Sequence, residues 1–230
     1  MIVIDALLCE FEGVLADTGA LRRRALRRAF ADEELPLGDR AAASCADGLA
    51  VEPAVRAALA SLGVQRDDTG VALLAMRAAR HFAALTARGL SLAPGAREFL
   101  DRARGATRLA LVTRATRREV DFVLTLAELD TAFECIVAAE DAPETPPEPD
   151  GFRIALERMS RRRPVRRDHA IALVDAAPAA RAARAAGLRA AIVGARPGGV
   201  GDADVIARSL ADLSLDAFAP LLASRKETVG

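Results

Sequence analysis

The chain has 230 residues, 52% of them apolar and 28% charged, and its 32 basic and 32 acidic residues cancel. This length allows one substantial domain, or a core with a smaller inserted unit. Because there is no net basic charge, and Phe is the only aromatic residue type, the composition argues against a nucleic-acid partner. No apolar run approaches the roughly 20 residues of a membrane span, so we expect a soluble globular protein with no membrane partner.

The cysteines and the N-terminus indicate where the protein resides. Cys9, Cys45 and Cys135 are widely spaced and odd in number, which fits neither a disulfide framework nor a zinc site and favours the reducing cytoplasm. The apolar run at residues 2–8 contains Asp5 and lacks a basic start, so it predicts a strand, not a signal peptide. Cys9, at the end of this run, is expected to be a buried strand residue.

Short apolar runs alternate with amphipathic helical patterns, which is typical of an α/β fold with a parallel sheet. In chain order, the runs predict strands at residues 2–9, 109–113, 135–138, 170–175 and 190–194, with a short edge strand at 203–206. The helical patterns that follow them lie at residues 117–129, 151–159, 177–186 and 210–222.

Between Asp17 and about Leu90 the pattern is helical throughout, with no convincing strand. Thr18 can cap a first helix, whose apolar face holds Leu21, Ala25, Leu26, Ala29 and Phe30. Two more helices are predicted at residues 51–62 and 71–85, and the Pro94-Gly95 turn returns the chain to the sheet. The sequence therefore predicts an α/β core made of residues 1–16 and 91–230, with a helical cap at 17–90.

Residues 9–18 read Cys-Glu-Phe-Glu-Gly-Val-Leu-Ala-Asp-Thr. This run resembles the first signature of the haloacid dehalogenase superfamily, Asp-x-Asp-Gly-x-Leu-x-Asp-(Thr/Ser), and the inserted cap is similar to that of the β-phosphoglucomutase and phosphoglycolate phosphatase branch. The resemblance implies a doubly wound, Rossmann-like parallel sheet and Mg²⁺-dependent phosphoryl transfer on a small phosphorylated metabolite. It also implies that Glu10 occupies the place of the nucleophile and Glu12 that of the general acid/base, both of which are aspartate in the family.

Three further segments resemble the other family signatures. Thr113, with Arg114 beside it, occupies the phosphate-donor position after the second core strand. Pro146 stands where the family has a lysine, and the only lysine of the chain is Lys226 in the C-terminal tail. In the fourth signature Asp175 is retained and Val174 replaces the first acid. The resemblance thus implies metal ligands at Glu10, Glu12 and Asp175.

The replaced residues weaken the expected chemistry. Glutamate keeps the charge of aspartate but adds a methylene, and a misplacement of about 1 Å can cost on the order of 100-fold in rate. Arginine, the remaining cation, is not an automatic substitute for the missing lysine. Mg²⁺ binding, if it occurs, is expected to be weak.

Three functions remain open from the sequence. The leading one is a phosphatase-like protein with a degraded catalytic set, little or no hydrolase activity and a retained phosphate- or metabolite-binding cleft. The second is an active Mg²⁺-dependent phosphohydrolase or phosphomutase-like enzyme that uses Glu10, Glu12, Thr113 and Asp175. The third is a protein-interaction module with an idle cleft. In all three, Glu10, Thr113 and Asp175 should lie at the carboxyl ends of adjacent parallel strands, where open α/β sheets place ligands, under a roof formed by residues 17–90.

Overall fold

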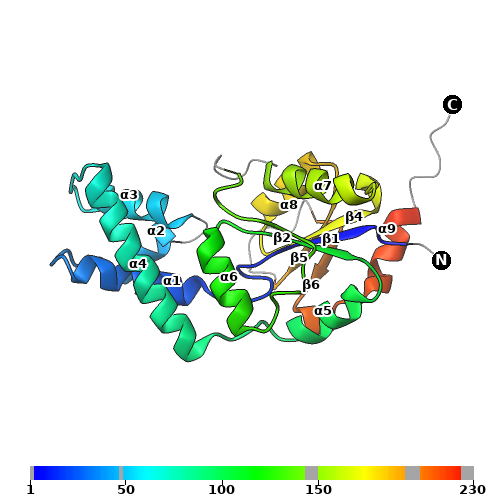
Figure 1. Ribbon diagram of the computed structural model, residues 1–230, viewed down its shortest axis with the longest axis horizontal. Coiled ribbons are helices and arrows are strands. Elements are labelled where there is room, and N and C mark those ends of the chain that lie inside the picture. Colours follow the sequence, from blue (N-terminus) through cyan, green and yellow to red (C-terminus); the bar gives the residue numbers. More distant parts are fainter. Residues whose placement is uncertain (1–2, 47–48, 143–149, 195–202, 224–230) are drawn as a thin grey trace. The chain divides into compact units, whose positions relative to one another are not determined.

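The computed structural model describes residues 3–46, 49–142, 150–194 and 203–223 (Figure 1). Contacts within the chain divide it into two compact units. The first comprises Met1–Ala16, Leu92–Thr113 and Leu129–Gly230; the second comprises Asp17–Ser91 and Arg114–Glu128. The segment Arg114–Glu128 thus groups with the inserted helices, whereas the sequence analysis placed it with the core. No helix of the described ranges is long and apolar enough to cross a membrane.

The first unit is built on a parallel sheet in the order β3-β2-β1-β4-β5-β6, which confirms the predicted fold class. The strands are β1 (Ala6–Glu10), β2 (Arg108–Val112), β3 (Cys135–Val137), β4 (Ala170–Val174), β5 (Arg189–Val193) and β6 (Val205–Ala207). Among the interior strands, β2, β1 and β4 have nearly all of their residues buried. Strands covered on both faces need such continuous apolar runs.

Helices cover both faces of this sheet (Figure 1). On one face α7 (Asp150–Arg162) and α8 (Ala177–Ala185) pack against alternate strand residues, among them Leu8, Val112 and Val174. On the other side of the sheet lies α5 (Ala96–Arg104), which contacts β2 and buries Phe99 and Leu100. The core is therefore the sheet together with the apolar faces of these helices.

The prediction of a single helix at residues 210–222 is wrong. Instead, two 3-10 turns, η2 (Leu210–Asp212) and η3 (Leu215–Phe218), precede a short α9 (Ala219–Ala223). Ser214 separates the turns with an extended backbone, and its hydroxyl accepts a hydrogen bond from the Asp216 N–H at 3.2 Å. A serine side chain that bonds to a nearby backbone N–H competes with helix continuation. A further 3-10 turn, η1 (Arg167–His169), precedes β4.

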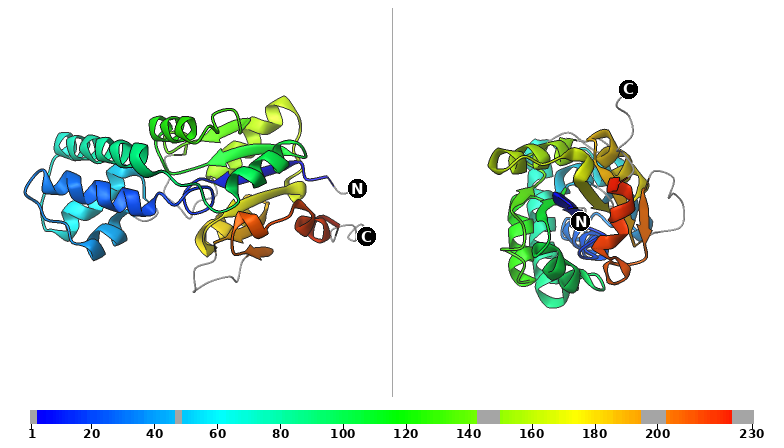
Figure 2. Two further views of the ribbon diagram at one scale, coloured as in Figure 1. Left: turned by 90° about the horizontal axis from the view of Figure 1, so that it is seen from below. Right: turned by 90° about the vertical axis from the view of Figure 1, so that its right-hand side faces the viewer.

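The second unit is helical. It contains α1 (Gly19–Ala31), α2 (Asp39–Ala46), α3 (Val51–Ser61), α4 (Asp68–Gly89) and α6 (Arg117–Leu126) (Figure 2). Its core includes Leu26, Phe30, Val55 and Leu74. The expectation that Thr18 caps α1 is wrong: its backbone is already helical, and its buried hydroxyl has no hydrogen-bond partner among the described residues. An N-cap oxygen reaches the first turn from an extended backbone.

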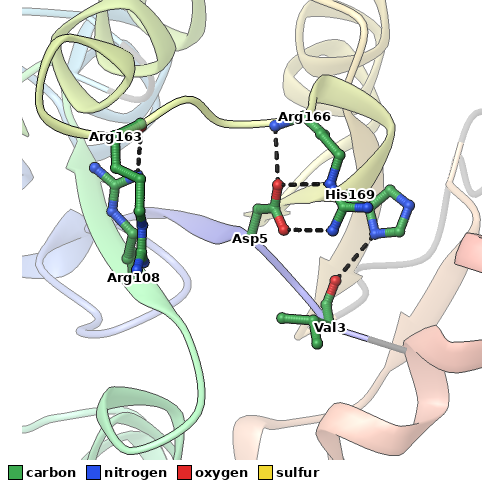
Figure 3. Close-up of polar contacts among 6 residues, drawn as sticks. All are labelled: Val3, Asp5, Arg108, Arg163, Arg166 and His169. Carbon is green, nitrogen blue, oxygen red and sulfur yellow. Dashed lines mark hydrogen bonds and ion pairs between the residues drawn. The ribbon is translucent and has the colours of Figure 1, made fainter. Parts of the chain in front are cut away.

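Arginine side chains secure the edge of the sheet where the strands begin (Figure 3). Arg108, the first residue of β2, donates to both carboxylate oxygens of Glu134, at 2.8 and 2.6 Å. It also donates to the carbonyls of Met159 at 2.7 Å and Arg163 at 2.9 Å, at the C-terminal end of α7. Arg108 holds the pKa of the Glu134 carboxyl below its usual value through this hydrogen bonding. One guanidinium therefore joins a strand, the residue before β3 and the end of a helix.

A second ion pair, between Arg166 and Asp5, fixes the chain just before β1 at the same end of the sheet. Arg166 donates to the Asp5 carboxylate from Nε at 3.0 Å and from Nη2 at 2.8 Å, and its backbone N–H adds a third bond of 3.0 Å (Figure 3). These bonds lower the pKa of the Asp5 carboxyl, with the Arg166 side chain as the main cause. The ring of His169 meets the Val3 carbonyl at 3.0 Å, so β1 and the approach to β4 are linked before the strands begin.

Replacing Arg108 tests the energetic role of this network. We expect Arg108→Ala to lower the free energy of unfolding by about 2–4 kcal/mol, because the largely buried carboxylate of Glu134 and the carbonyls of Met159 and Arg163 lose their hydrogen-bond donor. Arg161→Ala is the matched control, since its pair with Glu157 on α7 is 71% and 66% exposed and should contribute less than about 0.5 kcal/mol. Urea denaturation measures both. Equal, small losses would contradict the assigned role of Arg108.

The loop after β1 offers a second test, because Gly13 lies against the end of β4. Gly13 has a φ of +77°, and a Cβ atom there would lie 2.5 Å from Asp175 Oδ2. We expect Gly13→Ala to destabilise by about 3 kcal/mol, the sum of backbone strain and overpacking. Gly187→Ala, with a φ of +87° and its nearest contact at 3.4 Å, should show the strain alone, about 1 kcal/mol. Thermal unfolding of the two variants compares them directly, and similar losses would refute the close packing of Gly13.

Candidate functional site

The three residues expected at the site lie at the ends of neighbouring strands. β1 ends at Glu10, Thr113 follows the last residue of β2, and Asp175 follows the last residue of β4. β1 lies between β2 and β4. Glu10 pairs with Val112, the last residue of β2, and Cys9 pairs with Leu173, the next-to-last residue of β4. The prediction that Glu10, Thr113 and Asp175 occupy adjacent carboxyl ends is confirmed. Their position under a roof of residues 17–90 stays a prediction.

A tight loop continues from β1 and carries Glu12. The N–H groups of Leu15 and Ala16 both donate to the Phe11 carbonyl, at 3.0 and 3.1 Å, and the Gly13 N–H donates to the Ala16 carbonyl at 3.0 Å. Phe11, Val14 and Leu15 are buried, so apolar anchors hold the loop on the sheet while Glu12 is half-buried. The frame of the first signature is therefore a rigid turn that places its charged residues at the strand end.

The Glu12 carboxylate is engaged by the residue expected to bind phosphate. Thr113 Oγ1 donates a hydrogen bond to Glu12 Oε2 at 2.8 Å. Thr113 is only 8% exposed, and its backbone N–H donates to the Val137 carbonyl at 3.0 Å. The hydroxyl that, by the family resemblance, would donate to a phosphate oxygen therefore donates to the Glu12 carboxylate instead.

Glu10 makes the corresponding contact on the other side of β1. The backbone N–H of Asp175 donates to Glu10 Oε2 at 3.2 Å. This side chain therefore reaches sideways to the end of β4. In this arrangement both glutamates direct an oxygen at a donor of the core itself.

The remaining expected positions have less defined surroundings. Arg114 is half-buried and groups with the second unit, and its phosphate-binding role stays a prediction. Pro146, which stands in place of the family lysine, lies outside the described residues. Val174, in place of the first acid of the fourth signature, is fully buried in the core and presents no oxygen ligand.

Glu10, Glu12 and Asp175 are the candidate ligands for Mg²⁺. Mg²⁺ requires nearly ideal octahedral oxygen coordination and binds through one or two carboxylates together with water. In the described part of the chain, no group of three or more His, Cys, Asp or Glu side chains is arranged to hold a metal ion. As they are placed, Glu10, Glu12 and Asp175 do not form a magnesium cage, and metal binding by these residues stays a prediction.

Two further features of the site have a clear physical basis. Burial raises the pKa of the Cys9 thiol to about 12, so Cys9 is a strand residue and not a nucleophile. Gly13 brings the loop close to Asp175, a contact that the sequence analysis did not single out. The glycine directly after Glu12 was the available signal, because glycine is the residue of choice for a left-handed backbone with a close neighbour.

Comparison with known proteins assigns the sequence to a family. The sequence matches the haloacid dehalogenase-like hydrolases over residues 7–193. It is 30% identical to Protein CbbY of Cereibacter sphaeroides over 196 residues, which cover 81% of this chain and 83% of the relative.

Solved structures agree with this match. A crystal structure of CbbY from Rhodobacter sphaeroides in complex with phosphate superimposes with a TM-score of 0.82 at 26% identity, covering 94% of this chain and 100% of the other. A mutant of the same protein in complex with xylulose-(1,5)-bisphosphate gives a TM-score of 0.81 at 26% identity, with 94% and 99% coverage. The family resemblance read from residues 9–18 is confirmed, and the chain belongs to the haloacid dehalogenase-like hydrolases.

Proposed function

We propose that this chain is a catalytically degraded member of its family, with little or no phosphohydrolase activity, that retains a weak site for a small phosphorylated metabolite. The observation that supports this proposal most strongly is the hydrogen bond from the Thr113 hydroxyl to the Glu12 carboxylate. A carboxylate on a donor competes with a phosphate oxygen for that donor. It also repels the incoming anion, since both carry negative charge.

The position of Glu10 supports the same proposal. In-line attack on phosphorus requires the nucleophilic oxygen to be held within a narrow range of distance and direction. Glu10 Oε2 instead accepts the Asp175 N–H, which turns this oxygen toward β4. To attack phosphorus, Oε2 of Glu10 must first give up this hydrogen bond.

Charge balance adds a third argument. A phosphoryl-transfer site gathers several negative charges, which preorganised cations and donors must offset in the transition state. This chain has one lysine, Lys226, far from the signature positions in sequence, and Pro146 in the family lysine position. The signature lysine that the resemblance implies is therefore not there to offset the charge of Glu10, Glu12 and Asp175.

The ligand class follows from the relatives. CbbY from Rhodobacter sphaeroides has been crystallised with phosphate and, as a mutant, with xylulose-(1,5)-bisphosphate. Thr113 and Asp175 are retained here, and the Asp175 N–H and Thr113 O–H are anion donors once the glutamates move away. A small phosphorylated sugar is the ligand that these donors and the relatives favour.

The second candidate function is an active phosphohydrolase. It is favoured by the intact loop frame and by the two retained signature residues. In that case Glu10 attacks the phosphoryl group, Glu12 protonates the leaving oxygen and later removes a proton from water, and Thr113 holds a phosphate oxygen. Both glutamates must then leave the contacts in which they are found.

Neutralising Glu12 tests whether its carboxylate blocks anion binding. We expect Glu12→Gln to bind inorganic phosphate at least about tenfold more tightly than the parent, because it removes a nearby like charge and adds an amide donor. Isothermal titration calorimetry measures the affinity.

Two controls accompany this measurement. Glu157→Gln makes the same charge change on the exposed face of α7 and should leave phosphate affinity unchanged. Adding Thr113→Val to Glu12→Gln should remove the gain. If the parent binds phosphate as tightly as Glu12→Gln does, the blocking role of Glu12 is refuted.

Restoring the family residues tests the loss of catalysis. The triple variant Glu10→Asp, Glu12→Asp, Pro146→Lys should hydrolyse p-nitrophenyl phosphate in the presence of Mg²⁺, whereas the parent should show almost no turnover. Single reversions should do little, because residues of one catalytic unit act non-additively. Asp175→Asn in the restored variant should abolish the gain without unfolding the protein. Substantial turnover by the parent that disappears in Glu10→Ala would instead establish the second candidate.

A further inference from the structure

Two helices of the second unit, α4 and α6, lie side by side (Figure 1), and an apolar groove is lined by residues of both. Its volume is about 580 Å³, and its lining includes Leu73, Met76, Arg80, Ala83, Arg118 and Phe122. None of these residues takes part in the strand-end site, so the groove is independent of the function proposed above.

The groove exposes large apolar side chains that usually avoid water. Leu73 is 52% exposed, Met76 69% and Phe122 36%. On α6, Leu126 is 44% exposed and follows Phe122 by one helical turn, so the apolar surface continues along that helix. Neighbouring exposed apolar residues of this kind mark interaction sites, and methionine adapts its shape to different partners.

The charges at the groove are positive. Arg80 and Arg118 are exposed, and neither forms an ion pair within the described ranges; Arg80 acts only at longer range on the Asp32 carboxyl, whose hydrogen-bond partner is His81. Arg77 is already paired with Glu33 at 2.6 Å. The single acid of the groove, Glu119, is 8% exposed, completes the capping box of α6 with Thr116, and lies 3.6 Å from Arg22. Two arginines are thus available to an anionic partner, whereas the acid is committed within the fold.

We propose that the α4–α6 groove binds an amphipathic helix of a partner protein, with apolar side chains on one face and Asp or Glu on its flanks. The apolar face covers Leu73, Met76 and Phe122, and the acidic flanks pair with Arg80 and Arg118. A helix in a groove is a common recognition mode that uses such spaced anchors. The exposure of Met76 favours a protein segment over a small molecule, because small-molecule sites enclose most of their ligand.

Two designed, fluorescently labelled helical peptides test the charge preference. Both carry leucines along one face, and the flanks are glutamate in one and lysine in the other. By fluorescence anisotropy, the acidic peptide should bind at least about tenfold more tightly than the basic one. Arg80→Glu with Arg118→Glu should reverse this preference. The control pair Arg24→Glu with Arg28→Glu makes the same charge change at exposed positions on α1 and should not alter it.

Apolar variants test the anchor positions. Met76→Glu should weaken binding of the acidic peptide by about tenfold or more, whereas Ile206→Glu, at a 48% exposed residue of β6, should leave it unchanged. Circular dichroism verifies that each variant is folded. Equal binding of both peptides, or binding of neither, would overturn the proposal. Self-association of the parent that Met76→Glu abolishes would also overturn it, because the occupant would then be a second copy of this chain.

Discussion

The parallel register of β2, β1 and β4 is the constraint on which the candidate site depends. Because Glu10 pairs with Val112 and Cys9 with Leu173, these strands end at one edge of the sheet. Thr113, Glu10 and Asp175 are brought together there by backbone pairing and buried strand residues, independently of their own chemistry. Arg108 and Arg166 hold the opposite edge, where the strands begin. The frame can therefore persist while the reactive residues change.

Side-chain length then explains what happens at that edge. Each glutamate is one methylene longer than the aspartate of the family and reaches a donor of the core: Glu12 the Thr113 hydroxyl, and Glu10 the Asp175 N–H. In this account the carboxylates of Glu10 and Glu12 occupy two donors of the site. Glu10 and Glu12 are both partly exposed, so the proposed loss of chemistry is compatible with an intact sheet.

The fold could be predicted from the sequence where periodic patterns carry it. The buried runs at residues 109–113 and 170–175 indicated strands, and their ends located Thr113 and Asp175. The helix α5 was missed although Ala96, Phe99, Leu100 and Ala103 have helical spacing, and α2 was missed because its short, alanine-rich sequence has no large apolar residue. The break at Ser214 depends on one local hydrogen bond, which periodicity does not reveal.

The contacts of the site were less predictable for the same physical reason. Where a flexible glutamate directs its carboxylate depends on donors that are distant in sequence: Thr113 is 101 residues from Glu12, and Asp175 is 165 residues from Glu10. The α4–α6 groove likewise requires knowing that α4 buries Val71, Leu74 and Ala75 while leaving Leu73 and Met76 exposed.

A crystal structure of the parent protein grown with Mg²⁺ and orthovanadate, a mimic of the phosphoryl-transfer transition state, tests the central claim most directly. The account predicts that Glu12 remains bonded to the Thr113 hydroxyl, that Glu10 remains on the Asp175 N–H, and that no ordered metal lies between Glu10 and Asp175. Vanadate held in line with a Glu10 oxygen, with Mg²⁺ bound by Glu10 and Asp175, would contradict it and show that glutamate serves as the nucleophile.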